Sequence, residues 1–417
     1  MSDPTFPALH GRPASGWLND PNGLCRFGDR WHVFFQHNPD APTHGSITWG
    51  HVSSTDLLHW REEPVALRPR PGEVDAAGCW SGCVVDDDGT PTALYTAVRE
   101  HASDAWATLA RGDAELRTWV QGPPVVARPD DPEVAEVRDP FAFAFGGRRY
   151  VVQGAGRPEP GARPRLLVHD ASDLEHWLPA GTLLDDTDPV AATVAAADIW
   201  ECPNLFPLDG RWVLLLSLWR AERPGEGTLA GVRYLLGDLR PDPDTGAPRF
   251  VAESGGTLDS GPAFYAPQVL VQPDRVLLWG WSWELDRSAD QVAAAGWAGS
   301  LTFPRELVIT EGALVDRPAR ELTALRREPL DAGAPIDVPA FELEADGLLG
   351  LSLRTGDRDQ PVLEPGGAGP GPLRVLVDGS MIEIFGPTGS RTTRAYPAED
   401  SVWVVSGPAT GWVLGLP

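Results

Sequence analysis

The sequence predicts an all-β protein made of a five-bladed β-propeller followed by a small C-terminal β-sandwich. Three observations support this prediction. The 45 glycines and 42 prolines of the 417-residue chain separate short apolar runs, which is typical of many short strands joined by turns. One strand pattern recurs five times at a spacing of about sixty residues. After about residue 310 the repeat stops, and alternating strand-like segments continue to the end.

The repeat is a turn followed by a short apolar run, as in "GDRWHVFF" and "DGRWVLLL". The runs begin at Trp31, Thr92, Tyr150, Trp212 and Val276, which gives separations of 61, 58, 62 and 64 residues. A repeat of this length without helical periodicity predicts a propeller whose blades each hold four strands.

A short segment precedes each run by about eleven residues, and we expect these segments to be the innermost strands. Aligned in this way, the equivalent positions are Asp20, Ser81, Asp139, Glu201 and Tyr265. Asp20 lies within "NDPNG", which by itself indicates a turn. A turn does not explain why Asp20 shares a repeat position with two other acids, whereas a ring of catalytic groups around the propeller axis does.

The predicted domains are residues 1–312 for the propeller and 313–417 for a connecting helix and a shortened β-sandwich. The segment "RPARELTALRRE", residues 317–328, has the apolar spacing of a short helix. From about residue 341, apolar and polar residues alternate between glycines and prolines, as in an antiparallel sandwich.

The charge of the chain limits its partners. All 34 basic residues are arginine, and 59 acidic residues bring the net charge to -25, which disfavours nucleic acid and anionic membranes. The N-terminus has no basic segment followed by an apolar one, so we expect a cytoplasmic protein. We also expect a monomer or a weak homo-oligomer. Four cysteines form neither a disulfide framework nor a zinc motif, so we expect free thiols and no metal.

Carboxyl groups arranged in a ring suit glycoside hydrolysis, in which one acid protonates the leaving oxygen and another attacks or activates water. Arg138 precedes Asp139 and is expected to keep that aspartate ionised. Glu201 lies between Trp200 and Cys202, where desolvation is expected to raise its pKa, as a general acid requires. The 17 tryptophans suit either sugar stacking or core packing.

At these residues the chain resembles glycoside hydrolase family 32, the family of invertases, inulinases and levanases. The matching motifs are "WLNDPNG" at 17–23, "FFQHNP" at 34–39, "WGHVSSTDLLHW" at 49–60, "WSG" at 80–82, "RDP" at 138–140, "ECPNLF" at 201–206, "FYAPQ" at 264–268, "WGW" at 279–281 and "LTFPREL" at 301–307. "LRVLVDGSMIEIF" and "RAYP" are similar to the accessory sandwich of the family.

The resemblance implies a five-bladed propeller that needs no metal or cofactor. It implies that Asp20 is the nucleophile, Glu201 the general acid/base and Asp139 the transition-state stabiliser. The residues expected to line the fructosyl subsite are Asn19, Gln36, Trp49, Trp80, Ser81 and Arg138. Trp80, Tyr265 and Trp281 are also expected at the substrate, where they would crowd the axis and close the channel behind the bound sugar.

The predicted function is a retaining β-fructofuranosidase that releases terminal fructosyl units from sucrose or short fructo-oligosaccharides. Retention predicts about 5 to 5.5 Å between the carboxyl groups of Asp20 and Glu201. The alternatives are a fructosyltransferase, a hydrolase of another fructosyl metabolite and a non-catalytic carbohydrate-binding propeller. Ala263 and Gly379 replace residues common in the family, Asp and Arg, so the leaving group stays open.

Overall fold

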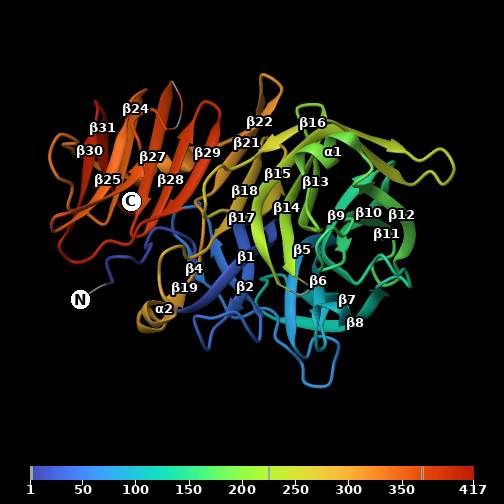
Figure 1. Ribbon diagram of the computed structural model, residues 1–417. Helices are drawn as coiled ribbons and strands as arrows, with labels where there is room; N and C mark the ends of the chain where they lie inside the picture. Colours follow the sequence, from blue (N-terminus) through green and yellow to red (C-terminus); the bar gives the residue numbers. More distant parts are fainter. Residues whose placement is uncertain (1–2, 224–225, 368, 370) are drawn as a thin grey trace.

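The computed structural model describes residues 3–223, 226–367, 369 and 371–417 (Figure 1). Five sheets form a ring in the first three quarters of the chain, and two further sheets form a separate layer structure at the C-terminal end. The all-β fold class predicted from the sequence, a five-bladed propeller and a sandwich, is confirmed. No helix in the described residues is long and apolar enough to cross a membrane, and the cytoplasmic location stays a prediction.

Each blade is an antiparallel sheet whose strands follow one another in sequence. The first blade holds β1 (Gly16–Phe27), β2 (Arg30–Asn38), β3 (Thr48–Ser54) and β4 (Arg61–Glu62). The second holds β5 (Gly78–Asp87), β6 (Thr90–Val98), β7 (Ala105–Gly112) and β8 (Trp119–Ala127). The third holds β9 (Glu136–Phe145), β10 (Arg148–Gly156), β11 (Arg165–Asp170) and β12 (Leu178–Asp185).

The fourth blade holds β13 (Ile199–Leu208), β14 (Arg211–Arg223), β15 (Glu226–Pro241) and β16 (Pro248–Thr257). The fifth holds β17 (Tyr265–Val271), β18 (Val276–Ser282), β20 (Ser300–Leu301), β21 (Arg305–Thr310) and β22 (Ala313–Pro318). The short helices are η1 (Ala102–Asp104), α1 (Pro189–Val194) and α2 (Ala289–Ala295).

The first strand of every blade lies at the centre of the ring. Strands β1, β5, β9, β13 and β17 pack against one another in this order, and β17 packs against β1. Strand β19 (Trp297–Ala298) comes from the fifth repeat but pairs in parallel with β1, through Gly16 and Trp297. The chain therefore closes the ring by adding a strand from its last repeat to its first blade.

Hydrophobic side chains fill the spaces between blades, because a blade has no core of its own. Phe34 and Trp49 of the first blade pack with Tyr95 of the second in one buried cluster. Phe143 and Val152 of the third blade pack with Leu214 of the fourth. Both faces of the middle strands are therefore covered, which explains why they read as continuous apolar runs instead of alternating ones.

The C-terminal unit consists of two packed sheets. The larger sheet has the order β23 (Arg326–Leu330), β31 (Thr410–Leu414), β24 (Ala340–Asp346), β27 (Pro372–Asp378), β28 (Met381–Gly386) and β29 (Gly389–Arg394). The smaller has the order β26 (Arg358–Leu363), β25 (Gly350–Thr355) and β30 (Ser401–Ser406). Phe341, Val375, Leu351 and Trp403 from both sheets share one buried cluster, as in a β-sandwich.

The connection between the units differs from the sequence prediction in two ways. Strand β22 pairs with β21 in the fifth blade, so the predicted boundary at residue 312 falls inside a propeller hairpin. The predicted helix over 317–328 is only the 3₁₀-helix η2 (Arg320–Leu325). Leu322 and Leu325 are its buried residues, and this spacing of three residues is that of a 3₁₀-helix.

Candidate active site

A β-bulge interrupts the innermost strand of every blade at the same height. The pairing with the second strand shifts between Leu18 and Pro21, Trp80 and Gly82, Arg138 and Phe141, Glu201 and Asn204, and Tyr265 and Gln268. The extra residues turn the backbone locally, and a bulge of this kind redirects side chains next to an active site. Five bulges around one axis therefore form a ring in which polar groups point at one another.

The bulges also turn backbone N–H groups toward the ring. Asp139, Cys202 and Ala266 have φ values of +59°, +46° and +46°, a conformation uncommon for residues other than glycine. The N–H of Asp139 donates to Thr96 Oγ1 at 2.8 Å, and the N–H of Cys202 donates to Asp139 Oδ2 at 2.8 Å. Strained backbone in the fourth blade thus supplies a donor to an acid of the third blade.

The bulges correct the repeat alignment by one residue. The bulge residues are Asp20, Ser81 and Asp139 in the first three blades, but they are Cys202 and Ala266 in the last two. Glu201 and Tyr265 precede the bulge, as Arg138 does in the third blade.

Asp20 is surrounded by hydrogen-bond donors from two blades. Asn19 Nδ2 donates to its Oδ1 at 3.0 Å, and both Ser81 Oγ and Gln36 Nε2 donate to its Oδ2, at 2.6 and 3.1 Å. Gln36 also donates to Ser81. Trp17 Nε1 donates to Asn19 Oδ1 at 2.7 Å, which fixes the amide. These donors hold one carboxylate in one orientation, and three of them, Asn19, Gln36 and Ser81, were predicted from the sequence.

Cys202 joins the two aspartates. Its Sγ lies 3.6 Å from Asp20 Oδ2 and 3.6 Å from Asp139 Oδ2. Burial raises the pKa of this thiol well above its usual value, and the nearby Asp139 and Asp20 add to the effect, so the sulfur carries its proton. Sulfur therefore fills the space between two carboxylates as a weak donor.

Glu201 belongs to the same cluster as the aspartates and has two polar side-chain contacts. Tyr265 Oη donates to Glu201 Oε2 at 2.7 Å, and Arg138 Nε lies 3.1 Å from Glu201 Oε1. Arg138 also donates to Glu136, a residue that the sequence reasoning missed. The only sequence feature that points to Glu136 is its position two residues before Arg138, which places both side chains on the same face of a strand.

The environment shifts the pKa of Asp139 and the pKa of Glu201 in the same direction. Burial raises the pKa of Asp139 to about 7, helped by Glu201 and Asp20 and opposed by Arg138. Burial also raises the pKa of Glu201, while Arg138 and Tyr265 oppose the shift. The expectation for Glu201 is confirmed. The expectation that Arg138 keeps Asp139 ionised is wrong, because the guanidinium contacts Glu136 and Glu201 instead.

Aromatic rings line one side of the site. Ring centroids are 6.1 Å apart for Tyr265 and Trp283, 5.7 Å for Trp283 and Trp281, 5.8 Å for Trp281 and Trp17, 6.2 Å for Trp17 and His44, and 6.3 Å for His44 and Trp80. We call these six residues the aromatic wall. The wall belongs to the fifth, first and second blades, whereas Glu136, Arg138 and Glu201 belong to the third and fourth.

Trp49, which was predicted to line the fructosyl subsite, lies elsewhere. Trp49 is fully buried in the core between two blades, and its Nε1 donates to the backbone oxygen of Trp80 at 2.9 Å. It therefore supports Trp80 and does not face the acids. His44, which the sequence reasoning missed because it lies in a loop without a strand pattern, has its ring next to Trp17 and Trp80 instead.

Amide side chains block the axis behind the acids. Gln268 accepts from the Leu24 N–H at 2.9 Å and donates to the Gly82 oxygen at 2.8 Å, so it joins three blades. Asn204 donates to the Pro267 oxygen at 2.9 Å and accepts from the Val269 N–H at 3.0 Å. The cavity left there measures about 10 Å³, room for a single water. The channel is closed, but not by Trp80, Tyr265 and Trp281 as predicted.

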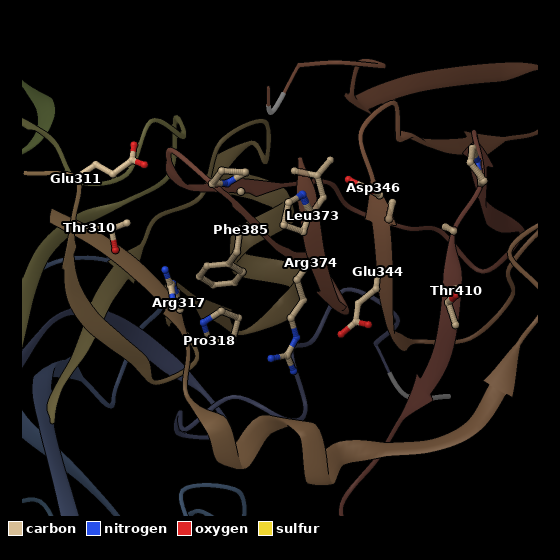
Figure 2. Close-up of a pocket in the computed structure, with 16 residues that line it drawn as sticks. Thr310, Glu311, Arg317, Pro318, Glu344, Asp346, Leu373, Arg374, Phe385 and Thr410 are labelled. Carbon is tan, nitrogen blue, oxygen red and sulfur yellow. The ribbon is translucent and has the colours of Figure 1, made fainter. Parts of the chain in front are cut away.

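A groove of about 1150 Å³ lies apart from the acids, between the fifth blade and the sandwich. Figure 2 shows Thr310 and Arg317 on the propeller side and Glu344 and Arg374 on the sandwich side. None of the predicted site residues lines this groove. The acid cluster of Asp20, Asp139 and Glu201, not this groove, is the candidate active site.

Comparison with known proteins identifies the family of the chain. Residues 10–318 match the family described as glycosyl hydrolases family 32 N-terminal domain. The chain belongs to glycoside hydrolase family 32. A sucrose-6-phosphate hydrolase of Klebsiella pneumoniae is 35% identical over 96% of this chain and 91% of its own length. A raffinose invertase of Escherichia coli is 33% identical over 84% of this chain and 71% of its own length.

Solved structures agree with this assignment to family 32. A β-fructofuranosidase of the family from Bombyx mori superposes with a TM-score of 0.80 at 25% identity and covers 99% of this chain and 94% of its own. Fructan 1-exohydrolase IIa from Cichorium intybus has the same fold, with a TM-score of 0.79 at 23% identity over 99% of this chain and 98% of its own. The chain is a family 32 glycoside hydrolase whose substrate is a carbohydrate.

Proposed function

We propose that the protein is a retaining β-fructofuranosidase that releases terminal fructose from sucrose and short fructo-oligosaccharides. One observation carries this proposal. Asp20 is held by donors from Asn19, Gln36 and Ser81, while Glu201, in the same cluster, has its pKa raised by burial. An oriented carboxylate and a protonated one are the two groups that a retaining glycosidase needs.

In the first step, an oxygen of Asp20 attacks the anomeric carbon of the fructosyl unit. The bond from that carbon to the glycosidic oxygen breaks, and Glu201 gives its proton to this oxygen as the leaving sugar departs. In the second step, the Glu201 carboxylate takes a proton from water, whose oxygen replaces Asp20 on the anomeric carbon. Asp139 accepts a hydrogen bond from the Cys202 N–H. When ionised, it stabilises the positive charge that develops in the transition state.

The closed axis supports removal of one unit at a time. Gln268 and Asn204 fill the channel beyond the acids, so a fructan chain has no exit through the propeller. An inulin oligosaccharide of defined length should therefore yield free fructose and the chain shortened by one unit, as chromatography of early products would detect. Internal fragments appearing first would exclude this mode of action.

The leaving group distinguishes two candidate substrates. The names of the relatives make sucrose 6-phosphate one candidate. The charge of the site favours an uncharged sugar, because the Arg138 guanidinium already lies between the carboxylates of Glu136 and Glu201. The neighbouring Asp139 and Asp20 add further acidic groups. We propose the uncharged sugar.

The test is a comparison of kcat/KM for sucrose, sucrose 6-phosphate, raffinose, inulin and levan. We expect sucrose and short fructosides to be hydrolysed faster than the phosphate ester, and NMR of the first product formed to show the β-anomer of fructose. A preference for sucrose 6-phosphate would overturn the leaving-group proposal, and initial release of the α-anomer would overturn retention. Products formed at high sucrose concentration separate hydrolysis from transfer, since a transferase accumulates trisaccharide.

A further inference from the structure

The contacts of Arg138 are unequal, although it lies between two carboxylates. Its Nη1 donates a hydrogen bond to Glu136 Oε2. Its Nε lies 3.1 Å from Glu201 Oε1, but the N–H is not aligned with that oxygen and has no hydrogen-bond partner among the residues that the structure describes. The guanidinium is therefore oriented by Glu136 and only approaches Glu201.

Glu136 can control this orientation because of its place in the strand. Glu136 and Arg138 are two residues apart on β9, so their side chains leave the same face of the blade. Glu136 is 8% exposed and Arg138 is 7% exposed, so neither group is strongly solvated. A buried pair of this kind holds its geometry much better than an exposed one.

The other groups that face Glu201 leave Arg138 as its only cationic neighbour among the described residues. Asp20 lies on β1, Asp139 and Glu136 on β9, and both aspartates and Glu136 carry acidic groups. Tyr265 on β17 donates a neutral hydrogen bond, and Cys202 on β13 is a protonated thiol. The charge state of Glu201 therefore depends on how well Arg138 is aligned with it.

We propose that Glu136 is a positioning residue that holds the Arg138 guanidinium out of line with Glu201, so that Glu201 keeps the proton it gives to the leaving group. This inference rests on the proposed function of Glu201 as general acid. Without the Glu136 carboxylate, Arg138 would turn toward Glu201 and stabilise its ionised form. Removal of the Glu136 charge also lowers the pKa of Glu201, because one negative neighbour of Glu201 disappears.

The experiment compares the wild type with Glu136→Gln, which keeps the shape and removes the charge. The alkaline limb of kcat/KM for sucrose reports loss of the proton from the general acid in the free enzyme. We expect this limb to move to lower pH by about one unit in the variant, with about tenfold lower kcat/KM on its alkaline side and little change below it. Glu136→Asp, which withdraws the carboxylate without removing it, should give a smaller shift in the same direction.

A matched control is Asp87→Asn. Asp87, the last residue of β5, also lies between two arginines, Arg111 on β7 and Arg149 on β10. This control should leave the limb in place. A limb that is unmoved or moves to higher pH in Glu136→Gln, or an equal shift in Asp87→Asn, would overturn the proposal.

A second measurement does not need turnover. Coupling of glycinamide to Glu201 by a water-soluble carbodiimide requires the protonated carboxyl, and peptide mass spectrometry gives its pH midpoint. We expect a lower midpoint in both Glu136 variants than in the wild type. If no fructoside is hydrolysed, the proposed function fails, yet the labelling midpoint still decides whether Glu136 controls the proton of Glu201. Equal midpoints would overturn the positioning role.

Discussion

Two buried arginines of this protein, Arg138 and Arg305, lie among acids but make very different contacts. Arg138, in the candidate active site, has a nitrogen without a hydrogen-bond partner in the described part of the chain, although a carboxylate lies 3.1 Å away. Arg305, at the junction of the fifth blade with the sandwich, is fully buried and donates from all its nitrogens. Its acceptors are Asp259, Asp316, Glu383, Ser390 and Thr392.

The pKa values of the acids around Arg305 and of those around Arg138 are shifted differently. At the junction, contacts with Arg305 and His10 outweigh burial and lower the pKa of Glu383, although burial still raises the pKa of Asp316. In the candidate active site, burial outweighs the charge of Arg138 and raises the pKa of both Asp139 and Glu201. Incomplete pairing of Arg138 therefore leaves Asp139 and Glu201 with raised pKa values that suit proton transfer. Complete pairing of Arg305 instead stabilises the contact between the two units.

The largest expected effect is the loss of turnover in Asp20→Asn. The variant lacks the group that forms the covalent intermediate, so turnover of sucrose should fall on the order of 10⁴-fold or more. Its melting temperature should not fall, because one of the mutually repelling acids is neutralised. Initial rates and thermal unfolding measure both effects. Activity above one hundredth of the wild type would contradict the role of Asp20.

Glu201→Ala should show a strong dependence on the leaving group. Sucrose needs protonation of its glycosidic oxygen, so its turnover should fall by about 10² to 10⁴-fold. An aryl fructoside with a good leaving group needs little protonation and should lose much less. Kinetics on the two substrates give the ratio, and equal losses would remove the assignment of Glu201 as general acid.

Arg305→Met should have the opposite profile to Asp20→Asn. It leaves Asp259 and Asp316 buried without their cation and Glu383 with only His10, which costs about 3 to 5 kcal/mol and lowers the melting temperature by roughly 5 to 15 °C. Below the transition, kcat for sucrose should stay within about twofold, since the junction does not touch the acid cluster. Arg317→Met, on the exposed side of β22, serves as the control and should change the melting temperature by at most about 2 °C.

Asp139 should make stability depend on pH. Its pKa is about 7 in the folded protein and about 4 in the unfolded chain, so the folded protein holds a proton that the unfolded chain has released between these values. The stability that this bound proton contributes to the folded protein is fully present below pH 4 and is lost as the pH rises through 7. Asp139→Asn should therefore melt higher than the wild type at pH 8, and the difference should vanish near pH 4. A difference that is constant over this range would contradict the raised pKa.

The smallest expected effect is that of Cys202→Ser. The thiol fills the space between Asp20 and Asp139, and a hydroxyl can do the same while donating to either carboxylate. Activity on sucrose should change by less than about tenfold, with the fold intact. Loss of all activity in a folded variant would show that Cys202 does more than pack.

The sequence alone determined the number of blades, the order of the strands and the three acids. The reason is physical: each blade must bury its faces against its neighbours, so the repeat of apolar runs is the repeat of the structure. Acids near the same point of successive repeats then approach one axis. Asn19, Gln36 and Ser81 could be predicted with them because they belong to motifs around those acids.

Only the tertiary structure decided how these groups act on one another. A proline follows the bulge residue in four blades, at Pro21, Pro140, Pro203 and Pro267. The apolar runs nevertheless did not show the one-residue offset between Glu201 and Cys202, which the pairing of β13 with β14 established. The folded arrangement decided that Arg138 orients toward Glu136 on its own strand, that Trp49 lies in the core while the His44 ring lies next to Trp17, and that Gln268 closes the axis. Burial and partner geometry set a pKa, and both arise only when strands distant in sequence meet around one axis.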